Sequence, residues 1–220
     1  MQAHGDSMRL SHLLTLRRGE TLFLPAHSRG KSLPNEIKSL LKGKPGIWDI
    51  PELPGFGGPT FDGAVMDSQN ESANVLGVKR GWYGVNGATG LLQAGVLAIA
   101  KPKDRVLMPR NVHKSIIHAC VLGNIQPVFF DLPFLEDRGH YLPANYIWFK
   151  SIINKIDIES IKIAAVVLTS PTYQGYSSDL KPLIKLIHSK GWPVLVDEAH
   201  GAYFSFYDDN DLPKSAISAG

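Results

Sequence analysis

The sequence has a single cysteine and no long apolar run. Cys120 has no second thiol to pair with, so an internal disulfide is impossible, and a reducing compartment is the natural setting. The longest apolar runs, residues 94–100 and 163–168, are far shorter than the roughly 20 residues that cross a bilayer. Residues 1–14 lack the pattern of a signal peptide. We therefore expect a cytoplasmic protein that does not enter a membrane.

Positive and negative side chains are also nearly balanced. The formal net charge is +3, and the densest basic group, Lys101, Lys103 and Arg105, lies in a turn-like stretch without interleaved aromatic residues. Nucleic-acid binding is therefore not expected. Hydrophobic residues make up 44% and charged residues 20% of the 220 positions, as in an ordinary globular protein of one domain or slightly more. No metal site is predicted.

The chain divides into a lead and an alternating region. Residues 1–60 contain short helical patterns and a connection rich in glycine and proline. From residue 61 onward helical and strand patterns alternate, with strands expected at residues 105–108, 126–130, 162–168 and 193–196 and helices at residues 90–100, 113–122, 147–156 and 180–187. This alternation predicts an α/β fold in which a mostly parallel sheet lies between two layers of helices, a three-layer α/β/α arrangement.

Asp197 follows a strand-like run and begins the segment Asp-Glu-Ala-His-Gly. In open α/β sheets ligands bind at the carboxyl ends of the strands, where a carboxylate can pair with a metal, a pyridinium or an arginine. The same pattern is found in helicase-type ATPases, which also need a G-x-x-x-x-G-K-[ST] loop. Gly30-Lys31-Ser32 would end such a loop, but its first glycine is replaced by Pro25, which has no N–H for a phosphate. We therefore reject the ATPase interpretation.

Three further junctions carry polar residues. Residues 86–90 form a small-residue turn before a helix, where free N–H groups, helped by the Thr89 hydroxyl, can bind a phosphate. His113 begins another helix and can stack on a heteroaromatic ring or simply cap that helix. Thr169 and Thr172 follow a buried strand, where their hydroxyls can bind a ligand or close a turn. Together with Asp197, these groups meet the needs of a phosphorylated aromatic cofactor.

An ordered series of segments resembles one family. Residues 25–31, 86–90, 110–115, 170–175 and 197–201 are similar to the Orn/Lys/Arg decarboxylases, which are fold-type-I enzymes that use pyridoxal 5′-phosphate (PLP). The resemblance covers nearly all of the chain from Thr21. It implies an incomplete PLP-dependent transferase-like large domain at residues 61–220, and a carbon–carbon lyase that converts ornithine, lysine or arginine to a di- or polyamine.

The resemblance also implies roles for individual residues. Asp197 would bind the pyridinium nitrogen, His113 would stack on one face of the ring and Ala199 would pack on the other. Catalytic roles would fall to His113, Asp197 and His200. The positions implied to contact the cofactor are Gly87, Ala88, Thr89, His113, Thr169, Thr172, Asp197, Ala199 and His200.

The sequence departs from the family pattern at two places. Ala26 stands where related enzymes more often have glycine. Related enzymes also carry a Schiff-base lysine in a Ser-x-His-Lys-type turn shortly after the aspartate strand, whereas here Lys214 is the only lysine after Asp197. Pro213 adjoins Lys214 and no buried strand precedes it, so we expect a surface residue. We therefore expect these 220 residues to lack the Schiff-base lysine and the small C-terminal domain, and to be inactive alone.

Three interpretations stay open at this point. The first is the decarboxylase, which by resemblance would be a homodimer or higher homo-oligomer, with residues 43–63 reaching the partner subunit. The second is another fold-type-I PLP enzyme, such as an α-oxoamine synthase or an aminotransferase. The third is a non-catalytic remnant that keeps the fold. The sequence does not choose among the three basic amino acids.

Overall fold

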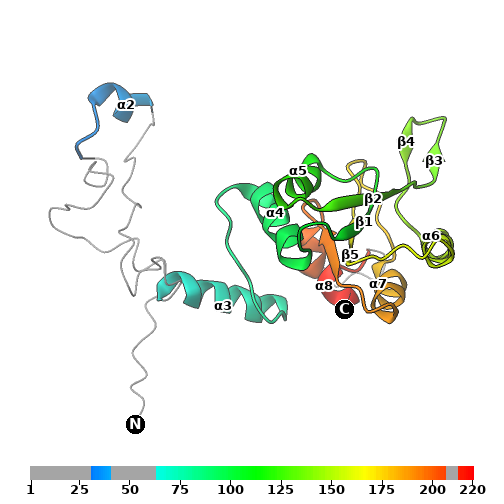
Figure 1. Cartoon of the computed structure of the whole chain (residues 1–220). Coiled ribbons are helices and arrows are strands. Elements are labelled where there is room, and N and C mark those ends of the chain that lie inside the picture. Colours follow the sequence, from blue (N-terminus) through cyan, green and yellow to red (C-terminus); the bar gives the residue numbers. More distant parts are fainter. Residues whose placement is uncertain (1–30, 41–62, 207–212) are drawn as a thin grey trace, which may run out of the picture. The chain divides into compact units, whose positions relative to one another are not determined.

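The structure is a computed structural model that describes residues 31–40, 63–206 and 213–220 (Figure 1). The chain separates into two compact units, residues 1–83 and 84–220. The boundary expected at residue 60, the segment 25–30 and most of the glycine- and proline-rich connection lie outside the described residues.

The first unit contains helices α2 (Asn35–Leu40) and α3 (Ala64–Leu76) among its described residues. Helix α3 ends at Gly77, whose φ of 68° lies in the left-handed region that suits glycine. The Tyr83 hydroxyl lies 2.8 Å from the Ser68 Oγ and 2.7 Å from the Ser72 Oγ on that helix. These contacts attach the end of the unit to α3.

The second unit contains a four-stranded sheet in the order β2-β1-β5-β6, and every adjacent pair of strands is parallel. The expected strands are confirmed. Their bounds are β1 (Arg105–Pro109), β2 (Gln126–Phe130), β5 (Ala165–Thr169) and β6 (Val194–Asp197). A small antiparallel pair, β3 (Phe134–Leu135) with β4 (His140–Tyr141), follows β2 and was not expected from the sequence.

Helices cover both faces of this sheet, so the predicted three-layer α/β/α arrangement is confirmed (Figure 1). One layer comprises α4 (Gly87–Ile99) and α5 (Lys114–Gly123), and the other comprises α6 (Tyr146–Ile158) and α7 (Leu180–Ser189). Successive strand residues point to opposite faces. Val167 therefore packs with the α4–α5 layer, and Val166 and Leu168 pack with the α6–α7 layer.

Cys120 lies in the core of the α4–α5 layer. Burial raises the pKa of its thiol, because desolvation disfavours the thiolate. Since the thiolate is the reactive form, this cysteine behaves as a small core residue.

Helix α4 begins at Gly87, three residues earlier than the sequence pattern indicated, so Ala88 and Thr89 belong to its first turn. The helix packs closely on β6 at Gly95, where an added Cβ would lie 3.0 Å from the Leu195 Cδ1. A glycine at this position allows the helix and the strand to approach each other. The first turn of α4 and the end of β6 line one cavity as a result.

The remaining described elements follow β6. They are a 3₁₀ helix, η1 (Ala202–Phe206), and the short helix α8 (Ala216–Ala219). The Glu198 Oε1 accepts a hydrogen bond from the Ala216 N–H at 2.8 Å, which ties α8 to the end of β6. Within the described ranges, no helix is long and apolar enough to cross a membrane.

Candidate active site

The carboxyl ends of β5 and β6 are joined at Thr169 and Asp197. These two residues are partners in the parallel register, and the Ser170 N–H donates to the Asp197 carbonyl at 3.1 Å. A cavity of about 480 Å³ opens beside them. Its lining residues are Ala88, Thr89, Leu92, Asn111, Val112, His113, Lys114, Thr169, Pro171, Tyr173, Asp197, Ala199 and His200.

Seven of the nine positions implied by the resemblance line this cavity. They come from the first turn of α4, the start of α5, and the ends of β5 and β6. The seven are Ala88, Thr89, His113, Thr169, Asp197, Ala199 and His200. Residues separated by more than a hundred positions in the sequence therefore meet at one edge of the sheet, as expected for strand ends in a parallel sheet.

The other two positions, Gly87 and Thr172, do not line the cavity. Gly87 is the first residue of α4 and has a φ of 59°, in the left-handed region. Thr172 is buried, and its Oγ1 accepts a hydrogen bond from the Tyr176 N–H at 3.2 Å. Its own N–H donates to the Tyr176 carbonyl at 2.7 Å. The Thr172 hydroxyl thus closes a turn, which is the alternative that the sequence had left open.

Asp197 is a buried carboxylate, with 7% of its surface exposed. Its Oδ1 accepts a hydrogen bond from the Ala199 N–H at 3.2 Å. Among the described residues, none forms an ion pair with it. A buried charge without a counter-ion is costly, so this position favours a cationic ligand group at the carboxylate.

Two residues that line the cavity carry polar atoms whose hydrogen-bonding capacity is unused. Among the described residues, the Thr169 Oγ1 and the Asn111 Oδ1 are buried without a hydrogen-bond partner. Asn86, the N-cap of α4, makes no side-chain capping bond to the first turn, so the N–H groups there can bind an anion. An anion site, unpaired polar atoms and a buried carboxylate on one cavity fit the phosphate, the polar substituents and the pyridinium of PLP.

His113 is the N-cap of α5, and its Nδ1 accepts a hydrogen bond from the Ser115 N–H at 3.2 Å. The Ser115 Oγ lies 2.9 Å from the same nitrogen, and Ser115 is completely buried. From the sequence, no role had been assigned to Ser115. Asn111 and Lys114 line the cavity as well and were likewise not assigned.

Two loops frame the cavity at the ends of β5 and β6. Gly201 has no room for a side chain, because an added Cβ would lie 2.7 Å from the Pro171 Cδ and 3.0 Å from the Glu198 Cγ. Tyr173 meets His200 edge to face, with ring centroids 6.1 Å apart. The two loops are therefore in direct contact over the strand ends.

The β3–β4 hairpin supports the loop after β5. The Arg138 Nη1 donates to the Tyr176 hydroxyl at 3.0 Å, and the His140 and Tyr176 rings lie 5.2 Å apart. The Ser178 N–H donates to the Ser170 Oγ at 3.0 Å, which closes the same loop. Thr169, at its start, is held by both the sheet and this loop.

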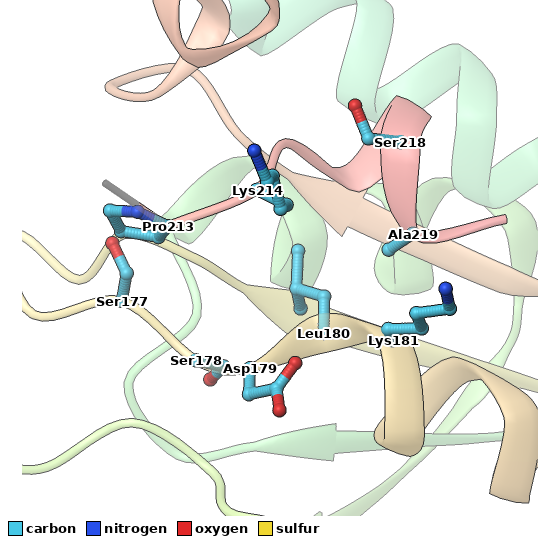
Figure 2. Close-up of a pocket in the computed structure, with 9 residues that line it drawn as sticks. All are labelled: Ser177, Ser178, Asp179, Leu180, Lys181, Pro213, Lys214, Ser218 and Ala219. Atoms are coloured by element: carbon cyan, nitrogen blue, oxygen red, sulfur yellow. The ribbon is translucent and has the colours of Figure 1, made fainter. Parts of the chain in front are cut away.

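Lys214 lies away from the Asp197 cavity. It is exposed, as expected from the sequence, and lines a second cavity of about 720 Å³ at the start of α7 (Figure 2). The other lining residues of this second cavity are Ser177, Ser178, Asp179, Leu180, Lys181, Pro213, Ser218 and Ala219. Lys214 is therefore not placed to react with a ligand at Asp197.

Glu198 follows Asp197 in the sequence, but its carboxyl group contacts α8 and not the cavity. Its side chain is partly buried and accepts a hydrogen bond from the Ala216 N–H at the first position of α8. Burial raises the pKa of this carboxyl above its ordinary value, and the hydrogen bond from Ala216 offsets part of that rise. Of the two adjacent carboxylates, only Asp197 lines the cavity.

Known proteins give an independent comparison. The family model described as "Orn/Lys/Arg decarboxylase, major domain" matches residues 59–220. Arginine decarboxylase of Bacillus subtilis (strain 168) is 31% identical over 208 residues, which cover 90% of this chain and 39% of that protein. Lysine decarboxylase LdcA of Pseudomonas aeruginosa is 27% identical over 173 residues, 74% of this chain and 22% of that protein.

The solved structures agree with these matches. Lysine decarboxylase A from Pseudomonas aeruginosa superposes with a TM-score of 0.78 and 20% identity, over 96% of this chain and 30% of that chain, which supports the same fold. This chain thus spans about two fifths of the arginine decarboxylase and less of the lysine decarboxylases. The family match extends over well more than half of the present residues. The chain belongs to the Orn/Lys/Arg decarboxylase family.

Proposed function

We propose that these residues form the cofactor-binding part of a PLP-dependent decarboxylase that acts on ornithine, lysine or arginine and releases a di- or polyamine. The observation that carries the proposal is the position of Asp197, a buried carboxylate without a described ionic partner. It shares a cavity with the first turn of α4, which has no side-chain cap. We further propose that the protein works in the cytoplasm as a homodimer or a higher homo-oligomer.

The first turn of α4 would bind the cofactor phosphate. Ala88 and Thr89 offer backbone N–H groups at the positive end of a 13-residue helix, and Thr89 adds a hydroxyl donor. The phosphate would satisfy donors that Asn86 does not cap. This anchor fixes the cofactor at the edge of the sheet without a covalent bond.

Asp197 would pair with the ring nitrogen and keep it protonated. When bound, PLP supplies an electron-accepting ring that takes up the electron pair released as the substrate α-carboxylate leaves as CO₂. The buried carboxylate stabilises the protonated nitrogen more than an exposed one would, because water screens the pair less. The Ala199 N–H holds the Asp197 Oδ1 in place for this pairing.

The ring faces would be bounded by His113 and Ala199, and the apolar side chains of Leu92 and Val112 would exclude water from the cavity. His200 would lie beside the cofactor, oriented by its edge contact with Tyr173. The unpaired Asn111 Oδ1 would accept a hydrogen bond from a polar ring substituent, and the Thr169 hydroxyl would donate or accept one.

Among the described residues, Lys114 is the only lysine that lines the cavity, and Lys214, the one lysine after Asp197 in the sequence, lines a different cavity. Lys114 is the first residue of α5 and directly follows His113, the proposed stacking residue. We propose that neither lysine serves as the Schiff-base residue, and that these 220 residues alone bind the cofactor but do not turn over substrate. Release of CO₂ from ornithine, lysine or arginine by the purified chain, abolished by Asp197→Asn, would contradict this part of the proposal.

Equilibrium dialysis with PLP tests the binding site itself. We expect the wild-type chain to retain the cofactor and Asp197→Asn to bind it at least about tenfold more weakly, since a buried charge pair is lost. Asp157→Asn is the matched control, because Asp157 is a partly exposed carboxylate in a surface pair with Lys190. Equal PLP binding by the wild type and Asp197→Asn would refute the assignment of the site.

A further inference from the structure

An imidazole is an unusual N-cap for a helix. Helices prefer serine, threonine, aspartate or asparagine at this position, whose oxygens accept hydrogen bonds from the first turn. In α5 that acceptor is the Nδ1 of His113, which receives the Ser115 N–H at 3.2 Å. The residue that lines the cavity is therefore also a structural part of the helix start.

The direction of these hydrogen bonds determines where the ring carries its proton. A backbone N–H can only donate, so the His113 Nδ1 must present its lone pair to Ser115. A neutral imidazole has one N–H, which must then be on Nε2. The Ser115 hydroxyl, 2.9 Å from Nδ1 and buried in the core, can donate its own proton to the same lone pair.

We propose that Ser115 is a positioning residue that holds His113 as the neutral Nε2–H tautomer at a fixed ring angle beside the cavity. The inference rests on the proposed function for its purpose. A neutral imidazole can stack on a protonated pyridine ring, whereas an imidazolium would place two positive charges face to face.

Nitrogen NMR of the full chain with ¹⁵N-labelled histidine tests the proposal without any cofactor. At a pH where histidines are neutral, we expect His113 to show an unprotonated Nδ1 and a protonated Nε2. Ser115→Ala keeps the backbone donor and removes the hydroxyl, so the ratio of the two tautomers should shift about two- to tenfold toward Nδ1–H. Ser115→Thr keeps a hydroxyl and should restore the wild-type ratio.

Ser215→Ala is the control for this experiment. Ser215 is equally buried, and its Oγ accepts a hydrogen bond from the Ser218 N–H as the N-cap of α8. This variant should lower stability without changing the His113 tautomer. A wild-type spectrum with the proton on Nδ1, or an unchanged tautomer ratio in Ser115→Ala, would overturn the proposal; the first result does not depend on any variant folding.

Dialysis with PLP separates this inference from the proposed function. We expect Ser115→Ala to bind PLP about two- to tenfold more weakly than the wild type, and Ser215→Ala to bind it equally. If the wild-type chain shows the Nε2–H tautomer but retains no PLP, the proposed function fails while the role of Ser115 stands. If PLP binds but the tautomer is Nδ1–H, the role of Ser115 is refuted and the proposed function survives.

Discussion

Thr169 and Asp197 stand side by side at the carboxyl ends of β5 and β6, joined by the hydrogen bond from the Ser170 N–H to the Asp197 carbonyl. Neighbouring strands lie about 4.8 Å apart, so a hydroxyl and a carboxylate on register partners can contact one small ligand. The site is therefore built on the rigid sheet, and the loops after the strands complete it.

Thr169 and Thr172 should respond in opposite ways to replacement by valine. Thr169→Val removes a buried hydroxyl that has no partner among the described residues, so the free energy of unfolding without cofactor should rise by about 1 kcal/mol. Thr172→Val removes the hydrogen bond from the Tyr176 N–H that closes the turn. The free energy of unfolding of this variant should therefore fall by about 1 kcal/mol. Urea unfolding measures both changes, and the same sign for the two variants would contradict this distinction.

The same pair should differ in cofactor binding. Thr169→Val should weaken the retention of PLP, because Thr169 lines the cavity, whereas Thr172→Val should leave the dissociation constant nearly unchanged as long as the chain is folded. Equilibrium dialysis at a temperature where both variants are native makes the comparison. Weaker binding by Thr172→Val alone would restore the role that the family resemblance implied for it.

His113→Asn should separate helix capping from ligand binding. Asparagine is a better N-cap than histidine, so the thermal midpoint should be maintained or raised, while PLP binding should weaken because the stacking ring is lost. His118→Asn, a change at an exposed position on the same helix, should affect neither measurement. If His113→Asn binds PLP as tightly as the wild type does, His113 is a structural cap only.

Gly201→Ala should destabilise the contact between the two loops at the strand ends. The added Cβ would meet the rigid ring of Pro171 at 2.7 Å, so the backbone must move, at a cost of about 1–3 kcal/mol. Urea denaturation should show a lower midpoint with an unchanged slope. Ala202→Ser, at the exposed neighbouring position, is the control, and an unchanged midpoint for Gly201→Ala would show that the loop accommodates a side chain freely.

Glu198 should make stability fall as pH rises through the acidic range. Burial raises the pKa of this carboxyl in the folded chain, so the folded state binds the proton more tightly than the unfolded state does. The stabilisation is fully present below the ordinary glutamate pKa and is lost as pH rises through the raised one. Glu198→Gln should remove this slope and still accept the Ala216 N–H.

Chemical denaturation at several pH values from 3 to 8 measures this slope. Glu136→Gln, at an exposed position in the β3–β4 turn, should keep the wild-type slope. A wild-type slope that persists in Glu198→Gln would assign the effect to other carboxyl groups.

The sequence by itself determined the layers of the fold. The run of residues 163–168 is apolar throughout and contains three β-branched residues, as strands buried on both faces require, and the helical faces between such runs leave few other arrangements. The β3–β4 pair could not be predicted in this way, because strands of two residues are too short to show a period. Their position depends on contacts with the loop after β5.

The residue types of the site were also readable from the sequence, because strand ends in a parallel sheet share one edge. Which hydrogen bonds these residues form, and which of them line the cavity, depended on the tertiary structure. In the folded chain Thr169 lines the cavity, the Thr172 hydroxyl closes a turn, and the His113 Nδ1 accepts a hydrogen bond from the Ser115 N–H. A linear pattern records which donors and acceptors exist, but hydrogen bonds depend on distances and directions that are established only when the loops pack.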